Sequence, residues 1–182
     1  MSAILIASYQ KPSAAAPPTN NKVPVASMTT NNLIYSANSS VIPFTNVSIL
    51  GATSPSGTNY KIKQIVLQVT GVTDSNNEKV IISGLEVPLV LSAAKPLPSG
   101  GTYAISSIGT TRIITLANTS GFSLPNTLIS TLAYKNDVLT PTLGVRTFLF
   151  KSVTDTGISG PAASQYGTNP FSAFNFTSTV TI

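Results

Sequence analysis

One stretch, Leu132–Gly157, constrains the fold more than any other part of the chain. From Val145 to Val153 the side chains alternate, with Phe148 and Phe150 on one face and mostly polar residues on the other. This two-residue period is typical of a β-strand with one buried face. Thr154–Gly157 then has the composition of a turn. The stretch therefore predicts a strand around which the remaining strands are laid.

Further strands are predicted on both sides of it. Seven segments are rich in β-branched and aromatic residues and are separated by turn residues: Val41–Leu50, Lys61–Thr70, Lys79–Ser83, Glu86–Leu91, Thr102–Ser107, Arg112–Ala117 and Phe171–Ile182. Lys135–Asp137 is interpreted as a polar break. Ser123–Leu132 is the helix candidate, with Ser123 as its N-cap, Pro125 in the first turn and leucines spaced by four.

These elements predict an all-β fold, an antiparallel β-sandwich with one short connector helix, and a β-barrel is the less favoured alternative. We expect the sandwich to occupy residues 41–182, and residues 1–40 to form an extended N-terminal arm rich in proline and alanine. The composition agrees with strands, because only 8% of the residues are charged. Exposed helices favour charged residues, whereas Ser, Thr and Asn suit strands and turns.

Two segments resemble a known family. YKNDVLTPTLGVRTFLFKSVTDTG (Tyr134–Gly157) is similar to the end of the cadherin-like, immunoglobulin-like repeats of large bacterial surface adhesins, through its Tyr-x-Asn, Pro-Thr-x-Gly-x-Arg and Val-Thr-Asp-x-Gly motifs. Ile65–Leu89 resembles the opening hairpin of such a repeat. The resemblance covers roughly Ile49 to Gly157 and implies a cadherin-like sandwich, here as a stand-alone protein. It also implies calcium as a candidate ligand, since the related repeats often work with it.

The composition argues against catalysis. The chain has no histidine and no cysteine, so it lacks the usual general base, a thiol nucleophile and the commonest zinc ligands. No motif marks a serine–lysine pair among the many serines. Any pair of catalytic carboxylates would have to come from five acidic residues: Asp74, Glu78, Glu86, Asp137 and Asp155. We therefore expect a protein that is not an enzyme and needs no cofactor.

A metal site is the one chemical alternative. Asp74, Asn76 and Glu78 place oxygen atoms on one predicted turn, and we expect Asp155 to approach them across the end of the sandwich. Calcium takes six to eight oxygen ligands, so these four residues are the candidate calcium ligands. The competing interpretation is a solvated polar turn.

Arg146 has a predicted structural role. It begins the alternating strand on the same face as the aromatic residues. A buried arginine is costly without an acidic partner. We expect Arg146 to pair with Glu78 or Asp137, in an ion pair that fixes how the two sheets meet.

The N-terminal region is too apolar for a linker that makes no contacts. Its apolar residues are Ile4, Leu5, Ile6, Val23, Val25, Leu33 and Ile34. We expect them to form an assembly arm that docks on another subunit. A disordered tail is the alternative.

The expected partners are copies of the chain itself, in a homo-oligomer, or a larger protein lattice. The net charge of +5 is carried by sparse lysines, which makes nucleic acid a poor partner. No apolar run of about 18 residues is present, so no membrane span is expected.

Two functional classes compete. The first is a virion structural protein, such as a phage capsid decoration or cement protein. The second is an extracellular bacterial surface, filament or adhesin-type subunit assembled by strand donation. The expected location is correspondingly the virion or the cell surface. A carbohydrate-binding module is a weaker third class, because the chain has no tryptophan for an aromatic platform.

Overall fold

The structure is a computed structural model that describes residues 23–37, 39–54, 57–157 and 171–182. Most of these residues lie in strands, beside the short helix α1 (Pro125–Ser130) and the 3-10 turn η1 (Ser75–Asn77). The strands are β1 (Val25–Thr30), β2 (Asn32–Ile34), β3 (Ser40–Val41), β4 (Phe44–Leu50), β5 (Ile62–Thr70), β6 (Glu78–Ile82), β7 (Leu85–Pro88), β8 (Ser92–Pro96), β9 (Thr102–Ile108), β10 (Thr111–Ala117), β11 (Ala133–Asn136), β12 (Val145–Asp155) and β13 (Phe171–Thr181). The predicted all-β fold is confirmed.

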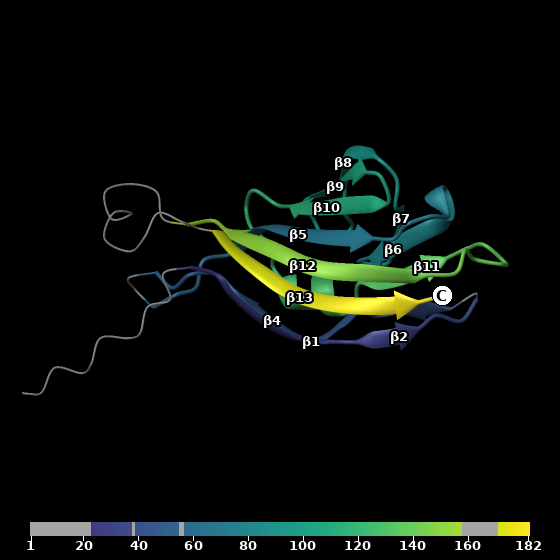
Figure 1. Cartoon of the computed structure of the whole chain (residues 1–182). Coiled ribbons are helices and arrows are strands. Elements are labelled where there is room, and N and C mark those ends of the chain that lie inside the picture. The colour runs from purple at the N-terminus through teal and green to yellow at the C-terminus, as the bar shows by residue number, and fades with distance from the viewer. Residues whose placement is uncertain (1–22, 38, 55–56, 158–170) are drawn as a thin grey trace, which may run out of the picture.

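The strands pack as a sandwich (Figure 1). The larger layer is a seven-stranded sheet in the order β2-β13-β12-β5-β10-β9-β8. The facing layer contains the four-stranded sheet β3-β11-β6-β7 and the two-stranded sheet β1-β4. Only Ile42 and Pro43 separate β3 from β4, so the chain passes directly from one small sheet to the other. Proline cannot donate a ladder hydrogen bond, which explains the break at this point.

The central strand of the prediction is β12. It lies between β5 and β13 and pairs antiparallel with both. Its inward-facing Phe148 and Phe150 are almost fully buried. Phe150 meets Phe44 of β4 edge-on at 6.4 Å between ring centroids, and Phe148 meets Tyr134 of β11 at 5.6 Å. Aromatic pairs favour this geometry, and here it joins the two layers.

The first strands correct the predicted boundary of the arm. Residues 25–34 are mostly β1 and β2, and both strands pair within the chain. Val25 opposes Leu50 of β4, and Leu33 opposes Val180 of β13. Val25 and Leu33 therefore belong to edge strands of the fold of their own chain, and not to the separate arm that was predicted for them. β2 runs parallel to β13, which departs from the predicted purely antiparallel sandwich.

The remaining arm residues divide into two groups. Val23 and Ile34 have exposed side chains. The other three, Ile4, Leu5 and Ile6, lie outside the described residues. Tyr35, which follows β2, is buried in the hydrophobic core. The described fold therefore includes residues from Val25 onward, well before the predicted boundary at residue 41.

Two further predictions differ from the structure. Lys135 and Asn136, interpreted as part of a polar break, are the last residues of β11, which pairs with β3 and β6. Asn136 is buried there, and its side-chain amide donates a hydrogen bond to Asp74. Strand β8 was not predicted, since its small, mostly exposed side chains show no alternation.

The helix predicted over Ser123–Leu132 is present as the shorter α1. Leu124 takes the N-cap position predicted for Ser123, and no side chain caps the helix. Leu128 and Leu132 are buried as part of the core, whereas Leu124 is exposed. No helix in the described ranges is both long and apolar enough to cross a membrane.

Candidate functional site: a buried polar network under an apolar tip

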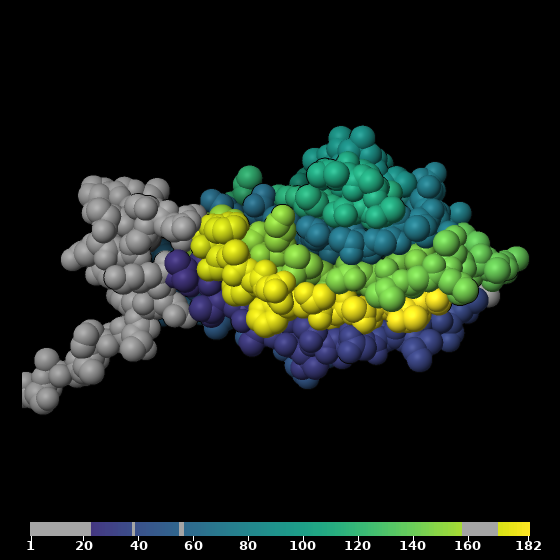
Figure 2. Space-filling model, viewed as in Figure 1, coloured from purple at the N-terminus to yellow at the C-terminus, as the bar shows by residue number. Residues whose placement is uncertain are grey.

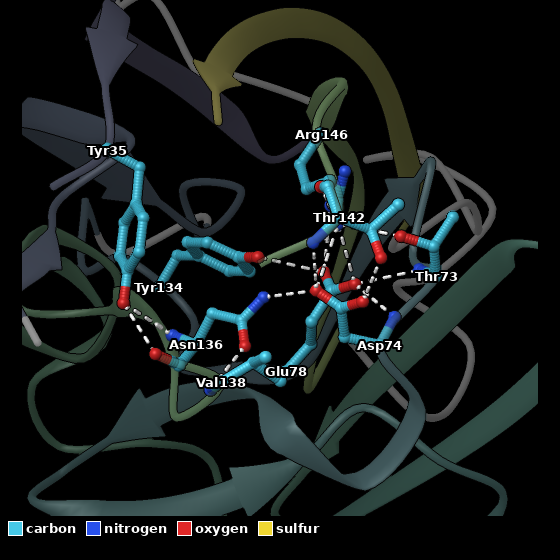
Figure 3. A network of polar contacts seen from close by, with 9 residues as sticks. All are labelled: Tyr35, Thr73, Asp74, Glu78, Tyr134, Asn136, Val138, Thr142 and Arg146. Atoms are coloured by element: carbon cyan, nitrogen blue, oxygen red, sulfur yellow. Dashed lines mark hydrogen bonds and ion pairs between the residues drawn. The ribbon is translucent and has the colours of Figure 1, made fainter. Parts of the chain in front are cut away.

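An ion pair between Arg146 of β12 and Glu78 of β6 joins the two layers (Figure 3). Both side chains are almost fully buried. Arg146 donates from Nε to Glu78 Oε2 and from Nη2 to Glu78 Oε1, each at 3.0 Å. This is the bidentate geometry that arginine forms with a carboxylate. Glu78 is one of the two partners predicted for Arg146, and the pair connects the sheets as expected.

Glu78 accepts three further hydrogen bonds. The backbone N–H groups of Thr73 and Asp74 donate to Oε1 at 2.7 and 2.8 Å, and the Tyr134 hydroxyl donates to Oε2 at 2.9 Å. Burial, together with the Glu78 charge, raises the pKa of Tyr134, so its hydroxyl remains a donor. Burial tends to lower the pKa of Arg146, but the hydrogen bonds and charge of Glu78 outweigh it and the pKa is raised.

Asp74 ties this network to the loop between β11 and β12. Its Oδ2 accepts hydrogen bonds from Asn136 Nδ2 at 2.7 Å and from Thr142 N at 3.0 Å, and its Oδ1 accepts one from the Thr142 hydroxyl. Arg146 Nη2 also donates to the Thr142 carbonyl oxygen at 3.1 Å. Burial tends to raise the pKa of Asp74, but the hydrogen bonds from Thr142 and Asn136 outweigh it and the pKa is lowered. The ionised Asp74 therefore anchors the loop.

Asn136 extends the network toward the end of β2. The Tyr35 hydroxyl donates to Asn136 O at 2.7 Å and accepts from Asn136 N at 2.9 Å. Asn136 Oδ1 accepts from Val138 N at 3.0 Å, which fixes the start of the loop. Sequence analysis missed this role, because a buried asparagine between Lys135 and Asp137 looks like a solvated polar run. The alternation of a short strand was the available signal.

The anchored loop presents apolar side chains to solvent. Leu139 and Leu143 are 81% and 82% exposed. Ile34 and Val145, 83% and 50% exposed, lie in one row with Thr181 of β13 between them. We call Ile34, Leu139, Leu143 and Val145 the apolar tip; it lies at the end of the sandwich where β13 ends, and Figure 2 shows the green loop projecting there. Only Ile34 was singled out from the sequence, although two leucines in a loop with proline and glycine were a usable signal.

Asp137, the other predicted partner of Arg146, belongs to a separate surface cluster. Lys79 and Lys135 oppose each other on β6 and β11, and each pairs with both Glu86 and Asp137. Alternation explains the difference, because Asp137 follows the inward-facing last residue of β11 and so points outward, away from Arg146. The alternative pairing of Arg146 with Asp137 is therefore wrong.

The four predicted calcium ligands do not come together. Asp74 and Glu78 point toward the Arg146 guanidinium, and Asn76 is exposed in η1. Asp155 lies nine residues beyond Arg146 on the same strand, which is about 30 Å at about 3.3 Å per residue. The predicted grouping is wrong, because Asp155 lies at the far end of β12, and Arg146 of the chain itself supplies the cation beside Asp74 and Glu78.

Asp155 has its own partners at the other end of β12. Its Oδ2 accepts from Ala52 N at 2.6 Å, and its Oδ1 accepts from Gly157 N at 2.8 Å. Burial raises the pKa of Asp155 despite these two hydrogen bonds. Within the described ranges, no group of three or more Asp, Glu, His or Cys residues is arranged to hold a metal ion.

Comparisons of the chain with protein-family models, with curated proteins and with solved structures found no match. The cadherin-like resemblance stays a prediction. The function therefore has to be argued from the residues of this chain.

Proposed function

We propose that this protein is a non-enzymatic structural protein that works by assembly, with copies of itself or with a larger protein lattice. In this proposal it is a virion component, such as a capsid decoration or cement protein. The β-sandwich supplies the contact surfaces, and the N-terminal residues that precede β1 supply a further attachment.

The observation that carries the proposal is the low charge on the outward face of the seven-stranded sheet. Two lysines lie at this face among the described strands, each at a register shift: Lys151 of β12, and Lys63 of β5, which lines a hollow with Gln64 and Ala117. A well-solvated surface carries charge on roughly 25–35% of its residues. Because this face carries much less charge, another protein could cover it at a low cost in desolvation. Three uncharged rows cross β9, β10, β5, β12 and β13: Ser106-Ile113-Gln68-Leu149-Thr177, Ala104-Thr115-Val66-Ser152-Ala173 and Thr102-Ala117-Gln64-Thr154-Phe171.

The carboxylates support a role without catalysis. Asp74 and Glu78 accept hydrogen bonds in the buried network, and Asp155 accepts two from backbone amides. Glu86 and Asp137 pair with lysines. A general acid or base must be aimed at a substrate proton, whereas these contacts direct each carboxylate toward the chain itself.

A second candidate is an extracellular surface, filament or adhesin-type subunit assembled by strand donation. The edge at β1 favours it, because β1 pairs only with β4 among the described strands, and its residues VASMTT include no charge and no proline. The edge strands β7 and β8 instead contain Pro88 and the pair Lys95-Pro96, which hinder strand addition. A donated apolar segment such as Ile4–Ile6 of a neighbouring copy fits the β1 edge.

Immunogold labelling separates the two candidates. An antibody raised against the folded protein is applied to virus particles and to cell envelopes from the natural source. Regularly repeated label on particles is the expected result. Label on the cell surface or on fibres supports strand donation instead. Protein found only as a free monomer, with no label on either structure, overturns both.

A further inference from the structure

The two ends of the sandwich differ in shape. The apolar tip projects at the end where β12 begins, with Leu139 and Leu143 more than four-fifths exposed. β12 has eleven residues, so its other end lies about 33 Å away at about 3.3 Å per residue. Side chains protrude at the first end, and the surface is hollowed at the second.

Two hollows adjoin at this far end. One has a volume of about 230 Å³ and is lined by Leu50 and Tyr60 together with the polar Lys61 and Asn126, and the other has a volume of about 180 Å³ and is lined in part by Leu128. They share Phe122 and Ser123. A cavity of about 150 Å³ lined by apolar side chains holds a benzene molecule. Each hollow therefore has room for one leucine side chain.

The projecting leucines are held in place before any partner arrives. Val138 N donates to Asn136 Oδ1, Thr142 is held by Asp74 and Arg146, and Gly144 forms two backbone hydrogen bonds with Ile182. Groups that are already ordered lose little freedom on binding, which lowers the entropic cost of association. The buried network therefore makes the tip a preorganised contact surface.

We propose that the apolar tip of one copy docks into the two hollows at the far end of a second copy, with Leu139 and Leu143 as the inserted side chains. This inference rests on the proposed structural function and names its contact. The occupant is a second copy, because this chain carries both the protruding leucines and hollows with room for them, at opposite ends. Such a contact joins unlike surfaces, so it repeats from copy to copy and builds an open head-to-tail filament unless the copies close into a ring.

Two classes of variant test the contact in the full chain by sedimentation velocity. Leu139→Ser with Leu143→Ser removes the tip, and Ser123→Trp fills the mouth shared by both hollows. We expect either change to raise the dissociation constant of self-association by about 30-fold or more, as loss of an interface hot spot does. Leu124→Asp is a second far-end variant, in case Ser123→Trp disturbs folding.

A matched control removes apolar surface elsewhere. Leu91 and Ile108 are 74% and 72% exposed, and Leu91→Ser with Ile108→Ser should leave self-association unchanged. The decisive step mixes the tip variant with a far-end variant, since each keeps the surface that the other lacks. We expect two monomeric variants to form a one-to-one heterodimer that grows no further.

The outcomes are distinguishable. If the far-end variants assemble like the unaltered protein, or if the mixture stays monomeric, the head-to-tail contact is overturned. Repeated label on particles together with that result leaves the structural function standing and removes only this contact. An unaltered protein that stays monomeric also overturns the contact.

Discussion

Each of the five carboxylates accepts hydrogen bonds or pairs with a cation inside the chain. The contacts are of two kinds. Glu78, Asp74 and Asp155 are held by buried or partly buried donors, whereas Glu86 and Asp137 share two lysines at the surface. The buried kind matters more for stability, because surface ion pairs contribute about 0–1 kcal/mol.

Arg146→Met tests the buried ion pair. The change leaves Glu78 buried without its cation, and breaking such a pair costs roughly 3–5 kcal/mol. We expect the free energy of unfolding in urea to fall by about that amount. Lys135→Met in the surface cluster is the control, with a much smaller expected loss because the ion pairs there are exposed to solvent. An unchanged midpoint for Arg146→Met would refute the role of the pair.

Acid should weaken the fold through Asp74. Its pKa is lowered in the folded state, so its ionised form contributes stability above the unfolded value of about 3.9. That contribution is lost as the pH falls through the folded pKa. The lowered pKa values of Glu86 and Asp137 act in the same direction, whereas the raised pKa of Asp155 opposes them.

Urea unfolding at several pH values measures this effect. We expect little change from pH 7 to about pH 5 and a progressive loss of stability below that. Asp74→Asn should be less stable at pH 7 but lose less on acidification, because it cannot titrate. Parallel curves for the variant and the unaltered protein would contradict the account of Asp74.

At the scale of elements, β12 and its neighbours determine where the tip is placed. Gly71 directly follows β5 with a φ of +82°, and a Cβ atom there would lie 2.3 Å from the Val145 carbonyl oxygen. Only glycine adopts a positive φ at low cost and also leaves room for the carbonyl oxygen, because it has no Cβ atom. This close approach seats the start of β12 beside the end of β5, next to the buried ion pair.

A matched pair of glycines separates steric fit from backbone conformation. Gly84 has a φ of +79° with nothing within 4 Å of a Cβ atom, so Gly84→Ala should cost only the strain of a left-handed residue, about 1–2 kcal/mol. Gly71→Ala adds a collision with backbone and should cost clearly more. Equal melting temperatures for the two variants would show that the close approach at Gly71 is unimportant.

Elements with a clear alternation were predictable from the sequence, and long-range pairing was not. The strands β5, β12 and β13 were predicted because buried and exposed side chains alternate along them. Arg146 was assigned an acidic partner because it shares a face with phenylalanines. The parallel pairing of β2 with β13 joins residues such as Leu33 and Val180, which are far apart in sequence and have no local signal.

The candidate site was predicted only in part, for a related reason. An acidic turn looks the same whether calcium or an arginine neutralises it, so Asp74 and Glu78 suggested a metal. The partner that decides between them comes from a distant strand. The exposure of Leu139 and Leu143 likewise depends on anchoring by Asn136 and Asp74, which the sequence does not reveal.

At the scale of the whole molecule, a sheet face with little charge, an apolar tip and a hollowed far end all favour contact with protein. The N-terminal residues add to this, and their deletion separates folding from assembly. Removing residues 1–22 leaves β1 and β2 intact, so we expect the melting temperature to stay unchanged while attachment to the lattice weakens. A deletion of residues 1–40 is no substitute, because it removes two strands of the fold. A fall in melting temperature on the shorter deletion would place residues 1–22 in the fold itself.

Sedimentation velocity of the full chain over a concentration series, at low and at high salt, tests the central claim most directly. The account predicts that the 18.8 kDa monomer gives way to larger species as concentration rises. It also predicts that salt does not weaken this assembly, because the inserted side chains, Leu139 and Leu143, are apolar and uncharged. A single 18.8 kDa species at every concentration and every salt level would contradict assembly from copies of the chain, and would leave attachment to a separate lattice as the form of assembly that the immunogold labelling tests.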